Sequence, residues 1–164
     1  MNSPLEMLLV LGLPGSGKST YVQRQMERSW KGSELICFDE LRRALGHAYH
    51  VTTEQHVNAV ACTVARVAFM RGRDVVIDES ITVPGLAMDL VGVAREYGAL
   101  VRIRHISTPV DACRANRVPH VMPAADFERK LTEWQMWGKF ILSLGDEMRN
   151  LEPVNACSLT APVR

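Results

Sequence analysis

The chain has 164 residues, of which 47% are hydrophobic and 23% charged, with a formal net charge of +1. These values are typical of one compact globular domain, and they give no sign of a strongly basic surface, although a local basic patch would suffice to bind nucleic acid. No apolar run approaches the roughly 20 residues of a membrane span, and the N-terminus lacks the pattern of a signal peptide. Four scattered cysteines indicate reduced thiols. We therefore expect a cytoplasmic protein with no membrane partner and no evident protein partner.

Short apolar runs alternate with helical patterns along the chain, and this alternation indicates an α/β fold. Glycines just after the expected helices, and prolines in their first turns, occupy the usual positions at helix ends. In chain order we expect a strand at 7–11, a helix at 17–29, a strand at 35–38, helices at 40–45 and 53–71, a strand at 75–77, a helix at 84–97, a strand at 100–106, helices from 108 and at 124–144, and an edge strand near 154–158.

Residues 12–19 read Gly-Leu-Pro-Gly-Ser-Gly-Lys-Ser and lie between the first strand and the first helix. This is the G-x-x-x-x-G-K-[ST] pattern of a phosphate-binding loop, whose glycines let backbone N–H groups point at phosphate oxygens. In this pattern Lys18 reaches the β- and γ-phosphates and the Ser19 hydroxyl coordinates Mg²⁺. The residues expected to bind the nucleotide are Gly12, Pro14, Gly15, Ser16, Gly17, Lys18, Ser19 and Thr20.

Polar residues follow the second and third strands, and parallel strands bring such positions to one edge of the sheet. Asp39 could accept a proton from an acceptor hydroxyl or could cap the next helix. Arg42 lies one turn later on the same face, where it could bind an anionic group of the acceptor or face solvent. Asp78 ends the third strand, where it could hold Mg²⁺ through water or orient the acceptor. Ser80 is a candidate for acceptor binding, and Glu79 is expected to point elsewhere if the strand continues.

Arg114 and Arg117 lie three residues apart near the end of a helix, before a loop that prolines bracket. This spacing places both guanidinium groups on one helix face. An arginine from a mobile lid can stabilise the charge that develops in phosphoryl transfer. Alternatively, the helix dipole alone favours arginines at this end.

With these blocks in place, the chain resembles the kinase domain of the phage-type polynucleotide 5′-kinase family, within the larger group of P-loop kinases. The blocks that carry the resemblance are residues 12–20, Asp39-Glu40-Leu41-Arg42, Val76-Ile77-Asp78, and Arg114-Ala115-Asn116-Arg117 with the loop and long helix after it. The resemblance covers roughly residues 8–137. It implies a single domain over residues 1–164, built as a P-loop three-layer sandwich. In this fold a mostly parallel sheet of four to five strands has helices on both faces, and a helical lid is expected at about 109–130.

The resemblance implies an ATP-dependent kinase that transfers the γ-phosphoryl group to a hydroxyl of DNA or RNA, with ATP and Mg²⁺ as cofactors. It assigns Asp39 as the general base, and Arg42 to the phosphate next to the acceptor hydroxyl. It assigns Arg117, together with Arg114, to the transferring phosphoryl group. The chain departs from the family at 78–80, where it has Asp-Glu-Ser in place of the usual D-x-[ST]-N.

This departure leaves other acceptors open. One is the 5-hydroxymethyl group of a modified pyrimidine, such as hydroxymethyluracil in phage DNA, which a phage-encoded enzyme would meet in the host cytoplasm. Another is the hydroxyl of a small molecule, for example a nucleoside, a sugar or an antibiotic, because the fold does not fix the substrate. A nucleotide-dependent switch or ATPase subunit is a third class, although the Asn-Lys-x-Asp guanine motif of GTPases is absent.

Overall fold

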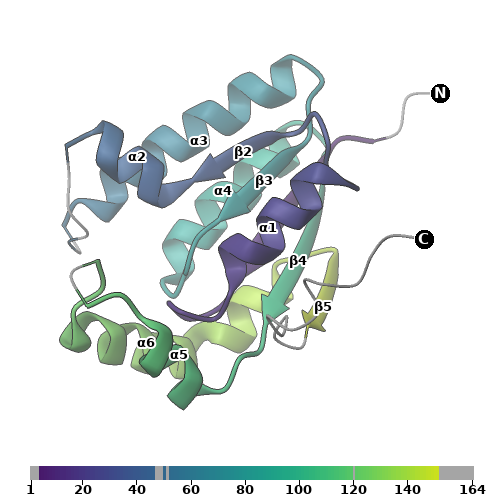
Figure 1. Cartoon of the computed structure of the whole chain (residues 1–164). Coiled ribbons are helices and arrows are strands. Elements are labelled where there is room, and N and C mark those ends of the chain that lie inside the picture. The colour runs from purple at the N-terminus through teal and green to yellow at the C-terminus, as the bar shows by residue number, and fades with distance from the viewer. Residues whose placement is uncertain (1–3, 47–49, 51, 120, 152–164) are drawn as a thin grey trace.

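Five parallel strands form one sheet in the order β2-β3-β1-β4-β5 in the computed structural model (Figure 1). The structure describes residues 4–46, 50, 52–119 and 121–151. All four pairings between neighbouring strands are parallel, so the carboxyl ends of the strands meet at one edge. The strands are β1 (Glu6–Leu11), β2 (Glu34–Cys37), β3 (Val75–Asp78), β4 (Leu100–Ile106) and β5 (Glu147–Leu151).

Helices cover both faces of the sheet, because side chains of the central strands alternate between the faces. On one face, Leu8 and Val10 pack against Val22 of α1. On the other face, Leu9 and its neighbours pack against α3, α4 and α6 in the larger core cluster. Figure 1 shows α1 in front of the sheet, with α3 and α4 behind it. The helices are α1 (Lys18–Glu27), α2 (Phe38–Ala44), α3 (Glu54–Met70), α4 (Pro84–Glu96), α5 (Val110–Asn116) and α6 (Ala124–Ser143).

The expected α/β sandwich with a parallel sheet is confirmed, and each element expected before residue 145 is present within a few residues of its expected bounds. One boundary shift matters for the site. Residue 38 was expected to end a strand, but α2 already begins at Phe38, so Asp39 lies inside its first turn. None of the helices that the structure describes is long and apolar enough to cross a membrane.

The fifth strand of the sheet lies in a segment for which the sequence predicted no strand. β5 pairs with β4 at Glu147–Leu151, whereas the edge strand expected near 154–158 falls outside the described residues. The backbone N–H of Val101 donates to the Asp146 carboxylate at 2.8 Å, and Arg104 pairs with Glu147 at 2.9 Å. β5 is polar and lies at the edge of the sheet. It is therefore held there mainly by this hydrogen bond, this ion pair and the ladder hydrogen bonds to β4.

Candidate active site

The loop at 12–17 joins β1 to α1 at the edge where the strands end. Gly17 precedes α1 in a left-handed conformation, with φ of 95°, and the N–H of Ser16 donates to the Leu13 carbonyl at 3.1 Å. Lys18 is buried, and its Nζ donates to the same carbonyl at 3.1 Å. Burial lowers the pKa of Lys18, while Glu79 and Asp78 partly offset this effect. The loop therefore presents a buried cation beside the N-terminus of a helix, which suits an anionic ligand.

Gly15 is the point at which α5 approaches the loop most closely. Its φ is 80°. A Cβ at this position would clash with the backbone carbonyl of Cys113 and lie 3.1 Å from the backbone nitrogen of Arg117. The side-chain amide of Asn116 also donates to the Gly15 carbonyl at 3.4 Å. The end of α5 thus lies directly against the loop, and only glycine fits there.

Substitution of Gly15 by alanine is expected to weaken binding of an ATP analogue by about tenfold or more. The left-handed backbone costs about 1–2 kcal/mol with a Cβ, and the clash with Cys113 displaces α5 from the loop. A fluorescence titration measures the effect. Gly32→Ala is the control, since Gly32 has a φ of 90° but open space around it. Equal affinity in both variants would contradict the assignment.

Asp78 and Ser19 meet beside Lys18. Asp78 ends β3 and is buried, and the Ser19 side chain makes a hydrogen bond to it. Burial raises the pKa of Asp78, and Lys18 and Ser19 oppose this shift. The described residues contain no group of three or more His, Cys, Asp or Glu side chains that could hold a metal ion. Ser19 and Asp78 can therefore supply only part of a Mg²⁺ shell, which is how the ion is usually held when phosphates and water provide the rest.

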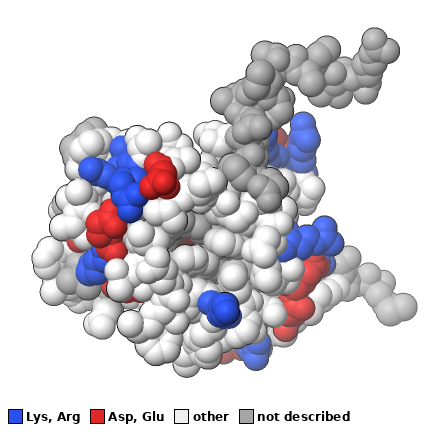
Figure 2. All heavy atoms as spheres, turned by 90° about the horizontal axis from the view of Figure 1, so that it is seen from below, with Lys and Arg blue, Asp and Glu red and all other residues white. Residues whose placement is uncertain are grey.

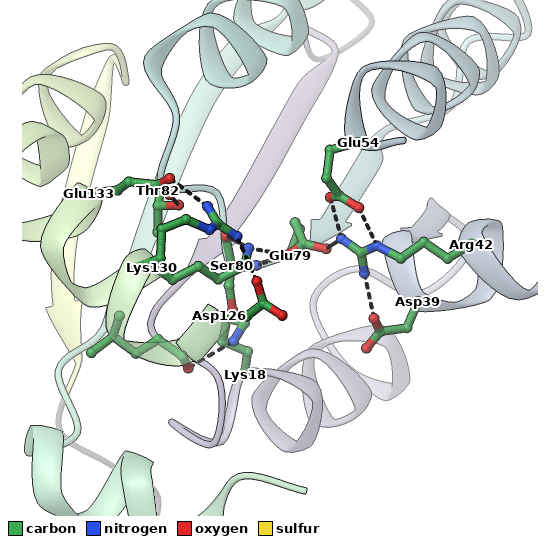
Figure 3. Close-up of polar contacts among 12 residues, drawn as sticks. Lys18, Asp39, Arg42, Glu54, Glu79, Ser80, Thr82, Asp126, Lys130 and Glu133 are labelled. Carbon is green, nitrogen blue, oxygen red and sulfur yellow. Dashed lines mark hydrogen bonds and ion pairs between the residues drawn. The ribbon is translucent and has the colours of Figure 1, made fainter. Parts of the chain in front are cut away.

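Arg42 is the centre of a cluster of carboxylates (Figure 3). Its Nη1 donates to Asp39 at 2.5 Å, and its Nε and Nη2 donate to the two oxygens of Glu54 at 2.8 and 2.6 Å. Nη2 also donates to Glu79 at 2.6 Å. The Arg42 side chain is 6% exposed, whereas that of Asp39 is 64% exposed. The buried Arg42 guanidinium thus positions the accessible Asp39 carboxylate.

Glu79 lies in the site; it was expected to point elsewhere only if the third strand continued, and β3 ends at Asp78. Its carboxylate contacts Arg42, lies 3.6 Å from the Lys130 Nζ, and accepts a hydrogen bond from the Ser80 N–H at 2.6 Å. Burial alone would raise its pKa, but Lys130 and Arg42 outweigh burial and lower the pKa of Glu79 to about 2. Glu79 is therefore ionised near neutral pH.

The Glu79 carboxylate is expected to stabilise the fold fully above pH 4.5, its ordinary pKa, and to lose that contribution as the pH falls towards about 2. Stability falls as the pH falls because Glu79 takes up its proton at a higher pH in the unfolded chain than in the folded one. In Glu79→Gln this titration is absent. Urea unfolding at a series of pH values should therefore show the difference in unfolding free energy between wild type and E79Q narrowing between these limits. A difference that stays constant would contradict this assignment.

Polar contacts fix α6 to the loop after β3. Lys130 is buried, and its Nζ donates to the Ser80 carbonyl at 2.8 Å. One turn later, Glu133 accepts a hydrogen bond from the Thr82 hydroxyl at 2.5 Å. The expected lid at 109–130 thus ends in a part of α6 that is fixed to the body of the domain. This leaves α5 and the loop before α6 as the segment that covers the phosphate loop.

The two expected lid arginines differ in position. Arg117 lines the cavity, its Nη1 donates to the Met122 carbonyl at 3.1 Å, and its buried Nε has no partner among the described residues. Arg114 does not line the cavity; it pairs with Asp111 and Glu128 at 2.7 and 2.8 Å. The structure therefore brings Arg117 to the site and leaves Arg114 outside it. A guanidinium that lines the cavity together with Lys18 fits a phosphate ligand.

These residues surround one cavity of about 270 Å³. Among the residues expected from the sequence, Gly12, Ser16, Gly17 and Thr20 do not line it, although all four belong to the loop or to the first turn of α1. Sequence reasoning missed Glu54 and Lys130 and undervalued Glu79. The cavity is lined by Pro14, Gly15, Lys18, Ser19, Asp39, Arg42, Asp78, Glu79, Ser80, Asn116, Arg117, Val118, Val121 and Met122.

Figure 2 shows the face of the molecule towards which the strands point in Figure 1. The face is hollowed near its middle. Lys and Arg side chains are spread over it together with Asp and Glu side chains. Charges of both signs thus lie on this face, mainly in mixed groups to the left and right of the hollow.

Comparison with known proteins agrees with this geometry. A protein-family model described as an AAA domain, AAA_33, matches residues 7–134. Among curated proteins, none is similar enough to match the chain. A structure of the Pnkp1/Rnl/Hen1 RNA repair complex has a TM-score of 0.71 at 18% identity; the match covers 85% of this chain but 47% of that one. This chain thus spans about half the length of that relative.

Two smaller kinases match over most of both chains. A gluconokinase from Sinorhizobium meliloti has a TM-score of 0.64 at 16% identity, covering 96% of this chain and 87% of that one. The Mycobacterium tuberculosis APS kinase CysC, in complex with AMPPNP and APS, has a TM-score of 0.61 at 16% identity, covering 94% and 92%. The chain belongs to the AAA_33 family of AAA domains and has the fold of the P-loop kinases.

Proposed function

We propose that this protein is an ATP-dependent kinase that transfers the γ-phosphoryl group to a hydroxyl of nucleic acid, most like a polynucleotide 5′-hydroxyl kinase. One observation carries the proposal. The accessible Asp39 carboxylate lines the same cavity as Lys18 of the phosphate loop and Arg117. A candidate general base therefore faces the place where the phosphate loop would present the end of a nucleotide.

In the proposed mechanism each group has one task. The loop amides and Lys18 bind the phosphates of ATP. Ser19, and Asp78 through water, would hold Mg²⁺, which would supply charge neutralisation at these phosphates. Asp39 orients the acceptor hydroxyl and takes its proton. Arg117 donates to the phosphoryl group during transfer. Most of the rate enhancement would come from alignment and charge stabilisation, because phosphoryl transfer needs little covalent help from the protein.

Two features support a nucleic-acid acceptor. The D-x-x-R block places Asp39 and Arg42 together on α2, as the resemblance to polynucleotide kinases implies. The structural neighbour with a TM-score of 0.71 belongs to an RNA repair complex. Within this class, the Asp-Glu-Ser sequence at 78–80 keeps the hydroxymethyl group of a modified pyrimidine in DNA as an alternative acceptor.

A small-molecule hydroxyl is the second candidate acceptor, and the engagement of Arg42 and the size of the cavity favour it. Arg42, the residue expected to hold a phosphate of the acceptor, already binds three carboxylates. The cavity of about 270 Å³ is also small. The gluconokinase structure, which matches over 96% of this chain, has the same fold.

Transfer of labelled γ-phosphate from ATP to a panel of acceptors tests the proposal. The panel contains 5′-hydroxyl DNA and RNA oligomers, DNA with internal hydroxymethyluracil and blocked ends, and a mixture of nucleosides and sugars. Label on the free-ended oligomers is the expected result. Label only on the blocked, modified DNA would favour a base-hydroxymethyl kinase, and label only on the mixture would favour the second candidate. ATP hydrolysis without any labelled acceptor would overturn the kinase assignment.

A further inference from the structure

The Arg42 guanidinium is already engaged by carboxylates at the acceptor side of the cavity. Four of its hydrogen bonds, at 2.5–2.8 Å, go to oxygens of Asp39, Glu54 and Glu79. The pair with Glu54 is bidentate, which is the strongest arrangement for a guanidinium and a carboxylate. A phosphate could bind Arg42 fully only by displacing one of these carboxylates.

Glu79 is the buried carboxylate that reaches Arg42 from within the cavity. It lines the cavity, whereas Glu54 binds Arg42 from α3 outside the lining. The Glu79 side chain is 9% exposed and is fixed by Arg42, Lys130 and the Ser80 N–H. Because Arg42, Lys130 and the Ser80 N–H all hold it, Glu79 cannot swing aside without breaking three contacts at once.

The carboxylates around Arg42 also oppose a phosphate placed directly beside this guanidinium. Two buried carboxylates, Glu54 and Glu79, and the accessible Asp39 surround the single guanidinium. A phosphate brought to this point would meet like charges at close range in a poorly solvated site. Lys130 and Lys18 offset part of the negative charge of Glu79, and the Lys130 Nζ binds the Ser80 carbonyl as well.

We propose that Glu79 is a specificity-determining residue, which together with Glu54 withholds Arg42 from the acceptor. The kinase then selects a hydroxyl without recognising a phosphate group next to it. This inference rests on the proposed kinase function and narrows its acceptor class. The preferred acceptor hydroxyl lies on an uncharged group of the acceptor. Arg42 then serves as a positioning residue for Asp39.

The test compares acceptors that differ by one phosphate. The kcat/KM of wild type is measured for a nucleoside and its 3′-phosphate, and for a free sugar and a phosphate of that sugar. We expect the phosphorylated member to be preferred by less than about threefold. In E79Q one of the three negative charges beside Arg42 is gone, and the preference should rise at least tenfold, equivalent to about 1.4 kcal/mol.

Matched variants separate specificity from damage to the fold. Glu54→Gln removes the other buried partner of Arg42 and should shift the preference in the same direction. Glu133→Gln removes a carboxylate of α6 that contacts Thr82 and Arg129, and it should leave the preference unchanged. The melting temperature and the affinity for an ATP analogue, measured for each variant, establish that it is folded.

The outcomes are distinct. A wild-type preference of tenfold or more for the phosphorylated acceptor would overturn this inference and leave the kinase assignment intact. An unchanged preference in folded E79Q and E54Q would also overturn it. If wild type phosphorylates neither member of either pair, nor any acceptor of the panel, the proposed function fails and this inference fails with it.

Discussion

Replacement of Asp39 by alanine is expected to lower turnover by at least about a hundredfold, the usual scale for loss of a general base. The affinity for ATP should remain close to that of wild type, because Asp39 lies on α2 and is no part of the phosphate loop. The fold should also persist, since the Asp39 side chain is 64% exposed and Arg42 keeps its contacts with Glu54 and Glu79. Steady-state kinetics and an ATP-analogue titration measure the two effects separately.

Glu40→Gln is the matched control for this experiment. Glu40 is the next residue of α2, it is exposed, and it does not line the cavity. Removing its charge should change turnover by less than about threefold. Asp39→Asn adds a second check, because asparagine keeps the size of the side chain but cannot accept a proton at neutral pH. An Asp39→Ala or Asp39→Asn enzyme with wild-type turnover would show that Asp39 is no base.

Local sequence patterns sufficed to predict the framework of this site. The phosphate loop follows from a fixed motif between a strand and a helix, and the positions of Asp39 and Asp78 follow from the rule that parallel strands end at one edge. Both residues line the cavity with Lys18. In each case the residue lies within a few positions of a recognisable strand or loop, so a short stretch of sequence carries the information.

The buried charges could not be predicted in this way. Glu54 and Glu79 reach Arg42 across 12 and 37 residues of sequence, and Lys130 reaches the loop after β3 across 50 residues. Nothing in the sequence around Glu54 or Lys130 distinguishes them from the charged residues of a solvated helix face. Their partners become apparent only when α3 and α6 are packed against the sheet. The same limit applies to β5, whose polar sequence Glu-Met-Arg-Asn-Leu lacks the apolar alternation of a strand.

One signal for Glu79 was nevertheless present. A second carboxylate directly after Asp78 would repel it in a buried site unless cations lay nearby. The structure provides Arg42 and Lys130 within 3.6 Å of Glu79. A buried Asp-Glu pair at the end of a central strand therefore predicts basic partners from distant segments, even though it does not identify them.

The paired arginines near the end of α5 give the sharpest test of which side chain acts on the phosphoryl group. Arg117→Ala is expected to lower kcat by about a hundredfold or more, with a smaller change in the KM for ATP. Its Nε is buried without a partner among the described residues, and Arg117 lines the cavity near Lys18. A guanidinium in this position donates to charge that develops only during transfer, so its loss appears mainly in kcat.

Arg114→Ala is the control, because it makes the same substitution three residues away. Arg114 is bound to Asp111 and Glu128 at the surface, and exposed pairs of this kind add little to stability. Turnover should therefore change by less than about threefold. If Arg114→Ala instead lost activity as severely as Arg117→Ala, the surface ion pairs would have to open during the reaction and deliver Arg114 to the cavity. The sequence-based expectation that both arginines act together would then hold for the closed enzyme. Single-turnover measurements on the two variants distinguish these cases, because they report the transfer step without product release.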